Sequence, residues 1–234
     1  GDRPPPPELL DWRANRLKQN NGSLKSLLKE IVLSKTYRQQ SIFSEQTPGV
    51  RKDTANRLLW RQNPRRMDAE TIRDSVLLVS GKLNDQTGGP GFEDFAYKEA
   101  YAPEYNYVTA DSPKLWRRSI YRFVVRTTPN RFMTTLDCPD PANFTPKRFT
   151  TTTPLQSLAL SNHAFMLRQA RSLAERIKHS AGPTPEHQVE LAFRLAFNRS
   201  PKPAARASSM SEVTKDHLII TCRHLPHADQ FIYF

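Results

Sequence analysis

The chain has 234 residues, with 35 Lys and Arg against 23 Asp and Glu, which gives a formal charge of +12 and a pI near 10. A chain of this length is long enough for a proper hydrophobic core, since such chains bury roughly 70% of their unfolded surface. Apolar residues make up 37%, Pro (19) outnumbers Gly (8), and no apolar run approaches the ~18 residues of a membrane span. The composition therefore excludes a membrane-spanning chain and indicates a loop-rich protein.

Two helices are expected near the start of the chain. The first should run from Glu8 to about Lys18, after a stiff polyproline stretch at Pro4–Pro7. Asn21-Gly22-Ser23 gives a turn and an N-cap for the second. Its apolar positions recur at helical spacing and predict a core-facing side: Leu24, Leu27, Leu28, Ile31 and Val32. Residues 40–52 are polar with a Pro-Gly pair and indicate a loop.

The middle of the chain combines a helix, a long loop and a strand. Asp68 is the expected N-cap of a helix that Gly81 ends, with an apolar stripe at Ile72, Val76, Val79 and Leu83. Residues 84–113 hold a Gly-Pro cluster and four tyrosines, which favours a long ordered loop. Residues 119–125 are rich in β-branched and aromatic side chains and form the best strand candidate.

Helical patterns resume from Pro154 and continue to about Ile177, and Thr184-Pro185 opens a further helix to about Phe197. Residues 204–211 carry the weakest helix signal of these segments. We therefore expect a mainly α fold with a small β component (α+β), rich in loops and proline. The organisation is expected to be a single domain over 1–234, with 200–234 less regular.

The cysteines and histidines suggest no metal or redox centre. Cys138 and Cys222 are 84 positions apart and match no C-x-x-C spacing, so two independent thiols are favoured over a disulfide. His224 and His227 lie three residues apart with no third ligand nearby, and no H-E-x-x-H occurs, so we expect no zinc site.

Arginines are concentrated between Lys114 and Arg131, a run without an acidic residue. Arg118, Arg122 and Arg126 are spaced by four and would share a face in either a strand or a helix. Such a ridge could hold a phosphate, sulfate or carboxylate through bidentate contacts. The alternative is that these arginines are solvated or pair with carboxylates from elsewhere in the chain, and this alternative is favoured.

The remaining positive charge is diffuse. Successive blocks of forty residues carry +4, +2, −1, +3 and +3, and the last 34 carry +1. No basic arm or recognisable nucleic-acid module is present, so we expect no specific nucleic-acid binding, and only weak, salt-sensitive binding to polyanions.

No catalytic motif stands out. The sequence lacks G-x-S-x-G, a Walker-type loop and G-x-G-x-x-G. Asp137 and Asp140 are the candidates for an acid-base pair, but both flank prolines in a segment where ordinary turn chemistry is the favoured explanation. Whether the protein is an enzyme stays open.

Several of these segments, taken together and in order, resemble one family. They are PELLDW (7–12), TYRQ (36–39), ANRLLWR (55–61), RRMDAETIRD (65–74), VSGKL (79–83), GGP (88–90), RRSIYRFVVR (117–126), FMTTLDCPD (132–140) and PLQSLALSN (154–162). They are similar to the planctomycete-type module known as domain of unknown function 1553, over residues 7–199.

The resemblance implies the C-terminal module of a large exported protein, periplasmic or at the cell surface, that packs on an upstream companion domain of the same polypeptide. Haem attachment would need C-x-x-C-H, which this segment lacks, so we expect no cofactor in it and any haem c in an upstream module. The resemblance also implies that the arginine ridge and the 136–140 loop both belong to the family pattern and face one another.

Three functions follow as expectations. The first is a structural or interaction module, biochemically unassigned. The second is part of an enzyme or binding protein for anionic cell-surface glycans, with Arg118, Arg122 and Arg126 holding the anion and Asp137 or Asp140 doing acid-base work. The third is a non-specific polyanion binder.

Overall fold

The computed structural model describes residues 6–41, 43–108, 111–213, 218–225 and 232. The chain divides into two compact units, Gly1–Arg65 and Arg66–Phe234, where the sequence suggested a single domain. Each unit is described below by itself. Within the described residues the fold is mainly α-helical with one two-stranded sheet, so the expected fold class is confirmed.

The first unit contains three helices, α1 (Pro7–Gln19), α2 (Leu24–Leu33) and the short α3 (Pro48–Lys52). The first two confirm the predicted helices, and the Ser23 hydroxyl caps α2 by accepting from the Ser26 amide at 3.3 Å. The Arg16 guanidinium joins α1 to α2 through two bonds, of 2.9 and 2.7 Å, to the Glu30 carboxylate. Helix α3 falls in the stretch predicted to be all loop, while Pro4 and Pro5 lie outside the described residues.

The predicted core face of α2 is wrong. None of the residues of α1, α2 or α3 is buried, and Leu28 is 59% exposed. The spacing correctly identified an amphipathic helix, but spacing does not say whether anything packs against the apolar side. Among the described residues of this unit, only Asn56 is buried.

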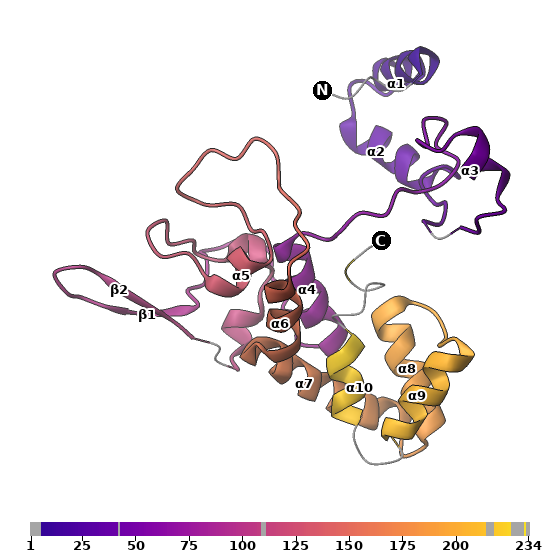
Figure 1. The fold of residues 1–234 in the computed structure, drawn as a ribbon. Helices are drawn as coiled ribbons and strands as arrows, with labels where there is room; N and C mark the ends of the chain where they lie inside the picture. The colour runs from indigo at the N-terminus through magenta and orange to yellow at the C-terminus, as the bar shows by residue number, and fades with distance from the viewer. Residues whose placement is uncertain (1–5, 42, 109–110, 214–217, 226–231, 233–234) are drawn as a thin grey trace. The chain divides into compact units, whose positions relative to one another are not determined.

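The second unit holds seven described helices, shown in Figure 1. They are α4 (Ala69–Ser80), α5 (Arg131–Thr135), α6 (Pro154–Asn162), α7 (Ala164–Ala181), α8 (Pro185–Phe197), α9 (Pro203–Val213) and α10 (Leu218–His224). The helices predicted from Asp68, from Pro154 and from Thr184 are confirmed. Helix α9 covers the segment with the weakest helix signal.

Helix α4 shows how the sequence fixes its ends. The Asp68 carboxylate accepts from the Thr71 amide at 3.1 Å, and Gly81 closes the helix at φ +78°, a conformation that favours glycine. Beyond that end, the Arg176 guanidinium of α7 donates to the carbonyls of Leu78 (3.1 Å) and Val79 (2.7 Å). A positive charge at the C-terminal end of a helix also interacts favourably with the helix dipole.

Helix α7 is central to the core of the second unit and packs against α4, α8 and α10. Fully buried side chains include Ile72 from α4, Ile177 from α7, Val189 from α8 and Cys222 from α10. A polar link crosses the same interface, because the Ser80 hydroxyl donates to the Gln169 side chain at 2.8 Å. The core is therefore built from segments more than 140 residues apart in the sequence.

The strand predicted over 119–125 is wrong. Ser119–Tyr121 forms a 3₁₀ turn, and Arg122 makes only an isolated bridge with Phe92. Burial explains the difference, since Ser119, Arg122 and Val125 are buried while the residues between them are exposed or half-buried. That period is three, whereas a half-buried strand requires a period of two.

The loop predicted over 84–113 contains the described sheet. Strands β1 (Phe95–Lys98) and β2 (Glu104–Tyr107) pair antiparallel, with Phe95 opposite Tyr107 and Tyr97 opposite Tyr105. Opposed residues share a face of the ribbon, so these four aromatic rings lie on one side. Figure 1 shows the hairpin extending away from the helices.

The C-terminal part of the second unit joins its core. Leu218 and Cys222 of α10 are buried, and the Met67 amide donates to the Ile232 carbonyl at 2.8 Å. Of residues 226–234, only Ile232 is among the described residues.

Candidate functional site

The three arginines predicted to form a ridge do not share one face. Arg122 is buried, with 6% of its side chain exposed, and faces Asp94 at 3.8 Å. Arg118 has 57% of its side chain exposed and lies 3.8 Å from Asp74. Arg126 is exposed. The segment is neither strand nor helix over this length, so the spacing of four does not align them.

Helix α4 organises this region through Arg73 and Asp74. The Arg73 guanidinium donates to the carbonyls of Arg117 (2.9 Å) and Leu115 (2.6 Å). The Asp74 carboxylate accepts from both the amide (2.8 Å) and the hydroxyl (2.7 Å) of Ser119. These bonds hold residues 115–119 on the helix and account for the buried Arg73.

Arg117 performs a similar structural task for the Gly-rich loop. Its guanidinium donates to the carbonyls of Gln86 (3.3 Å), Gly88 (2.5 Å) and Pro90 (2.7 Å), and stacks 4.1 Å from the centre of the Tyr121 ring. Two members of the basic run, Arg117 and Arg122, are therefore buried among groups of the chain itself, Arg117 among backbone carbonyls and Arg122 beside the Asp94 carboxylate.

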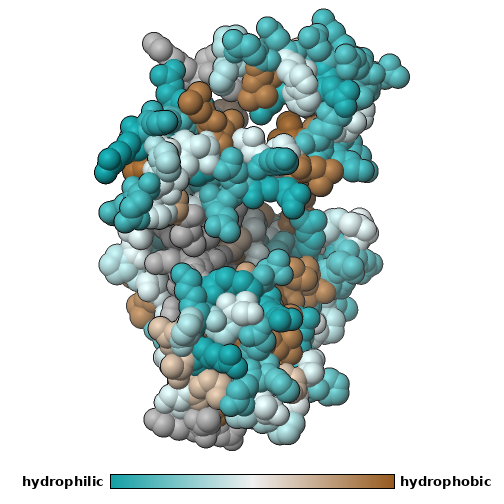
Figure 2. Space-filling view, turned by 90° about the vertical axis from the view of Figure 1, so that its right-hand side faces the viewer, coloured by the Kyte–Doolittle hydropathy of each residue, from teal (hydrophilic) through white to brown (hydrophobic). Residues whose placement is uncertain are grey.

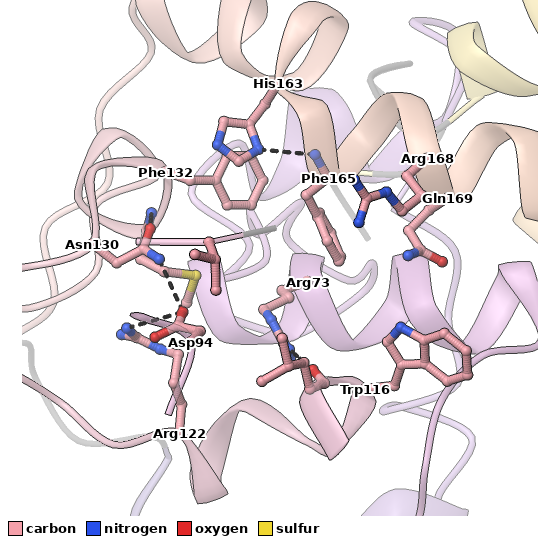
Figure 3. Close-up of a pocket in the computed structure, with 13 residues that line it drawn as sticks. Arg73, Asp94, Trp116, Arg122, Asn130, Phe132, His163, Phe165, Arg168 and Gln169 are labelled. Carbon is pink, nitrogen blue, oxygen red and sulfur yellow. Dashed lines mark hydrogen bonds and ion pairs between the residues drawn. The ribbon is translucent and has the colours of Figure 1, made fainter. Parts of the chain in front are cut away.

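A cavity of about 60 Å³, which we call the arginine cavity, lies between these segments and α7. Figure 3 shows side chains from α4, α5, α7 and the intervening loops around it. Its polar lining residues are Arg73, Asp94, Arg122, Asn130, His163, Arg168 and Gln169, and its aromatic ones are Trp116, Phe132 and Phe165. Of these, the sequence singled out only Arg122 as a candidate.

Only one of the two carboxylate oxygens of Asp94 has a hydrogen-bonding partner among the described residues. Its Oδ2 accepts from the Asn130 side chain at 3.0 Å, while Asn130 also caps α5 by accepting from the Met133 amide at 3.2 Å. Burial raises the pKa of Asp94, and the nearby charges of Arg122 and Arg73 only partly oppose this. Its Oδ1, and Nη1 of Arg122, are buried and have no hydrogen bond to any described residue.

His163 is a neutral member of the cavity wall. Burial lowers the pKa of its imidazole. Its Nδ1 accepts from the Phe165 amide at 3.3 Å, which leaves the proton on Nε2, and its ring stacks on Phe132 at 4.4 Å. Burial likewise lowers the pKa of Arg73, which contacts the faces of Phe92 and Phe165.

Asp137 and Asp140 are engaged elsewhere. The Asp137 carboxylate accepts from Arg66 (2.7 Å), from the Thr151 amide (2.7 Å) and hydroxyl (2.8 Å), and from Gln156 (3.1 Å). Burial by itself raises the pKa of Asp137, but these bonds outweigh it and lower the pKa below its usual range. The Ala142 amide, and then the Asn143 side chain, lower the pKa of Asp140 in a local turn.

A carboxylate with a lowered pKa is ionised at neutral pH and has no proton to donate there. Neither aspartate is among the described residues that line the arginine cavity. The acid-base role of the two aspartates therefore stays a prediction from the sequence.

Both cysteines are free thiols, as expected. Burial raises the pKa of Cys222 to about 12. Burial and then the charge of Glu70 raise the pKa of Cys138 to about 11, with Sγ 3.7 Å from the Glu70 carboxylate. A thiol with a raised pKa is a poor nucleophile.

The first unit presents a second candidate surface. A groove of about 540 Å³ is lined by apolar residues that include Leu9, Trp12, Ile31 and Leu58, with Arg13, Arg57 and Arg61 among its charged members. Trp12 is 48% and Leu58 75% exposed. Figure 2 shows apolar atoms, in brown, reaching the surface between hydrophilic ones on the face it presents.

Comparison with family models finds a match to PSD1, described as a protein of unknown function (DUF1553), over residues 1–212. The chain belongs to the DUF1553 family. No curated protein and no solved structure matches this DUF1553 chain. The resemblance noted from the sequence is confirmed, and the match extends past the predicted limit of 199.

The segments that carried the resemblance to DUF1553 have mostly structural tasks here. Arg73 and Asp74 bind residues 115–119, Arg117 binds the Gly-rich loop, and Asp137 binds residues 151–156. None of the described helices of this DUF1553 chain is both long and apolar enough to cross a membrane. In the described part of the chain, no three His, Cys, Asp or Glu side chains converge on a common point as metal ligands would; His217 and His227 lie outside it.

Proposed function

We propose that the chain is a non-catalytic interaction module of a larger exported protein, and that its first unit packs on a companion domain of the same polypeptide. The observation that supports this most is the first unit's missing core: not one apolar side chain among its described residues is buried. The family match adds no activity that would favour catalysis instead.

The energetics favour a partner for this unit. Its large exposed apolar side chains are Leu10, Trp12, Leu24, Leu28, Val32, Leu33, Tyr37, Phe43 and Leu58. Each gains roughly 1.5–3 kcal/mol when it is moved from water into an apolar contact. A unit of this size with no buried apolar residue has little else to offset its conformational entropy, and clustered exposed apolar side chains are typical of interaction sites.

The net charge of the first unit indicates what kind of surface its partner should have. Residues 1–65 carry 13 Lys and Arg against 6 Asp and Glu, a net charge of +7. A surface that covers it should therefore be apolar at its centre and acidic at its rim, because complementary charges steer association and like charges oppose it.

The test is carbene footprinting, read by mass spectrometry, of the 234-residue chain and of the natural polypeptide that contains it. Labelling of Trp12, Leu28 and Leu58 should fall in the longer polypeptide, because a covered side chain no longer meets the reagent. Phe144 (93% exposed) and Leu173 (2% exposed), both in the second unit, serve as the labelled and unlabelled controls.

Equal labelling of the three side chains in both samples would overturn the proposal. Protection that develops in the 234-residue chain alone as its concentration rises would also overturn it, since the cover would then be a second copy. Protection in the longer polypeptide that is independent of concentration supports a companion in the same chain.

A further inference from the structure

The arginine cavity of the second unit contains two buried polar atoms without a hydrogen-bonding partner in the described chain, Nη1 of Arg122 and Oδ1 of Asp94. They belong to the same ion pair, in which Nη1 of Arg122 lies 3.8 Å from the other carboxylate oxygen, Oδ2, beyond hydrogen-bond length. Buried polar groups are nearly always hydrogen-bonded, so two orphaned atoms on the two members of one ion pair that lines a cavity indicate a further group in that cavity.

The pair is fixed in this open geometry by its surroundings. Only 6% of the Arg122 side chain and 13% of the Asp94 side chain are exposed. Asn130, which also caps α5, donates to Oδ2 of Asp94 at 3.0 Å, the same oxygen that faces Arg122, so the orientation of the carboxylate is fixed while Oδ1 has no partner. Figure 3 shows Asp94 between Arg122 and Asn130 at one side of the cavity.

The size and charge of the cavity limit what can enter. A buried water needs roughly 10–15 Å³ of such space, so a volume of about 60 Å³ holds about four waters or one group of similar size. Three guanidinium groups and one carboxylate line the cavity, together with the neutral His163. Guanidinium forks match the oxygens of carboxylate and phosphate groups.

We propose that this cavity binds a small oxyanion, of the size of acetate or phosphate, that accepts a hydrogen bond from Nη1 of Arg122. The orphaned oxygen of Asp94 is satisfied when one proton is shared between it and the bound anion, as between paired carboxylates. The charged groups around that proton are Arg122, Arg73 and Arg168. The site differs from the predicted ridge, because Arg118 and Arg126 take no part in it.

The experiment titrates the full 234-residue chain with sodium formate, acetate, phosphate and sulfate at constant ionic strength, using chloride as the reference, by isothermal titration calorimetry. Arg122→Gln is the test variant. Arg126→Gln is its matched control, since it removes the same charge from an exposed arginine four residues away. The carboxylate and phosphate arms distinguish an organic acid from an inorganic anion.

The wild-type chain should bind one of these anions saturably at one site. Affinity should be unchanged in Arg126→Gln and about tenfold lower or worse in Arg122→Gln, the expected effect of losing a charge-assisted hydrogen bond. No saturable binding, or the same loss in both variants, would overturn the proposal, because either would leave only waters in the cavity or a general charge effect.

Circular dichroism establishes whether Arg122→Gln is folded. If it is not, a crystal of the wild-type chain grown with selenate decides the question through the anomalous signal of selenium. A peak in the cavity beside the Arg122 guanidinium supports the site. Selenate at surface lysines and arginines with only water in the cavity overturns it.

Discussion

Asp137 shows how much one side chain can organise. Its carboxylate accepts four hydrogen bonds, from Arg66, from Thr151 twice and from Gln156, while its own backbone lies at φ +64°. Asp tolerates this left-handed conformation better than most residues because its short side chain bonds locally. The bonds join the end of α5 to the start of α6 across a loop without regular structure.

Replacing Asp137 should therefore be costly. We expect Asp137→Ala to lower the free energy of unfolding by about 2 kcal/mol, since it leaves partly buried donors without an acceptor. Asp140→Ala, in the exposed turn five residues after α5 ends, should cause a smaller loss. Urea denaturation of the two variants measures the difference, and equal losses would show that Asp137 is only a turn residue.

The contribution of Asp137 to the free energy of unfolding should depend on pH, and the direction of its pKa shift gives the sign. The pKa of Asp137 is lowered on folding, so its contribution is present above the unfolded carboxyl pKa of about 3.9 and is lost as pH falls through the lower folded value. The gap in stability between wild type and Asp137→Ala should consequently narrow between about pH 5 and pH 3. A gap that is constant with pH contradicts the hydrogen-bonded carboxylate.

For single residues, the sequence predicted which side chains make specific contacts better than it predicted which residues they contact. It singled out Arg122, Asp137 and Cys138, all of which make specific contacts. It could not pair Arg122 with Asp94, or Asp94 with Asn130, because these residues come from separate loops and no local pattern connects them. A cavity lined by seven separate stretches of the chain leaves no periodic signal in any one of them.

Among the secondary-structure elements, the ends of helices were the feature that the sequence predicted best. Thr153 and Thr184 both precede a proline and both stand at an N-cap, but only Thr153 is followed three residues later by a glutamine, the pattern of a capping box. The structure distinguishes them in the same way. Thr153 forms a full capping box with Gln156, whereas Thr184 makes no side-chain capping bond.

This difference gives a matched pair of variants. Thr153→Ala should lower the free energy of unfolding by about 1 kcal/mol, the usual value of an N-cap bond, and Thr184→Ala should change it by a few tenths at most. Thermal unfolding followed by circular dichroism compares them directly. Equal shifts in Tm for both variants would mean that the capping box contributes nothing.

The elements that the sequence missed lie where tertiary contacts override local preference. Residues 119–125 have strand-forming side chains, but Asp74 binds Ser119 and turns the chain at that point. The hairpin at 95–107 could not be predicted from a turn signal, because its loop of five residues lacks Asn-Gly or Asp-Gly. Its alternating aromatic residues are also compatible with the ordered loop that we expected there.

For the whole molecule, the two units should differ in local stability. Amides of α4 and α7 lie next to a buried core and should exchange hydrogen only through global unfolding of the second unit. Amides of α1 and α2 have no buried apolar residue beside them and should exchange through low-energy local opening. Hydrogen exchange read by mass spectrometry on the 234-residue chain tests this, and equal protection in both units contradicts it.

The family match and the structural core have different limits. The match ends at residue 212, yet Leu218, Cys222, Leu225 and Ile232 belong to the same buried cluster as Ile72 and Leu173. The sequence marked 200–234 as less regular because residues 204–211 are small and polar. Helicity there comes from the packing of α9 against α8 and α10, which composition does not reveal.

The bond between the Met67 amide and the Ile232 carbonyl has a consequence for synthesis. Met67 leaves the ribosome long before Ile232, so α4 must wait through the translation of more than half the chain before its neighbours are all present. During that interval its buried positions, among them Ile72 and Leu77, stay open to other proteins. A ribosome-associated chaperone would therefore find a binding site on this nascent chain at α4 until α7, which packs against that helix, has been made.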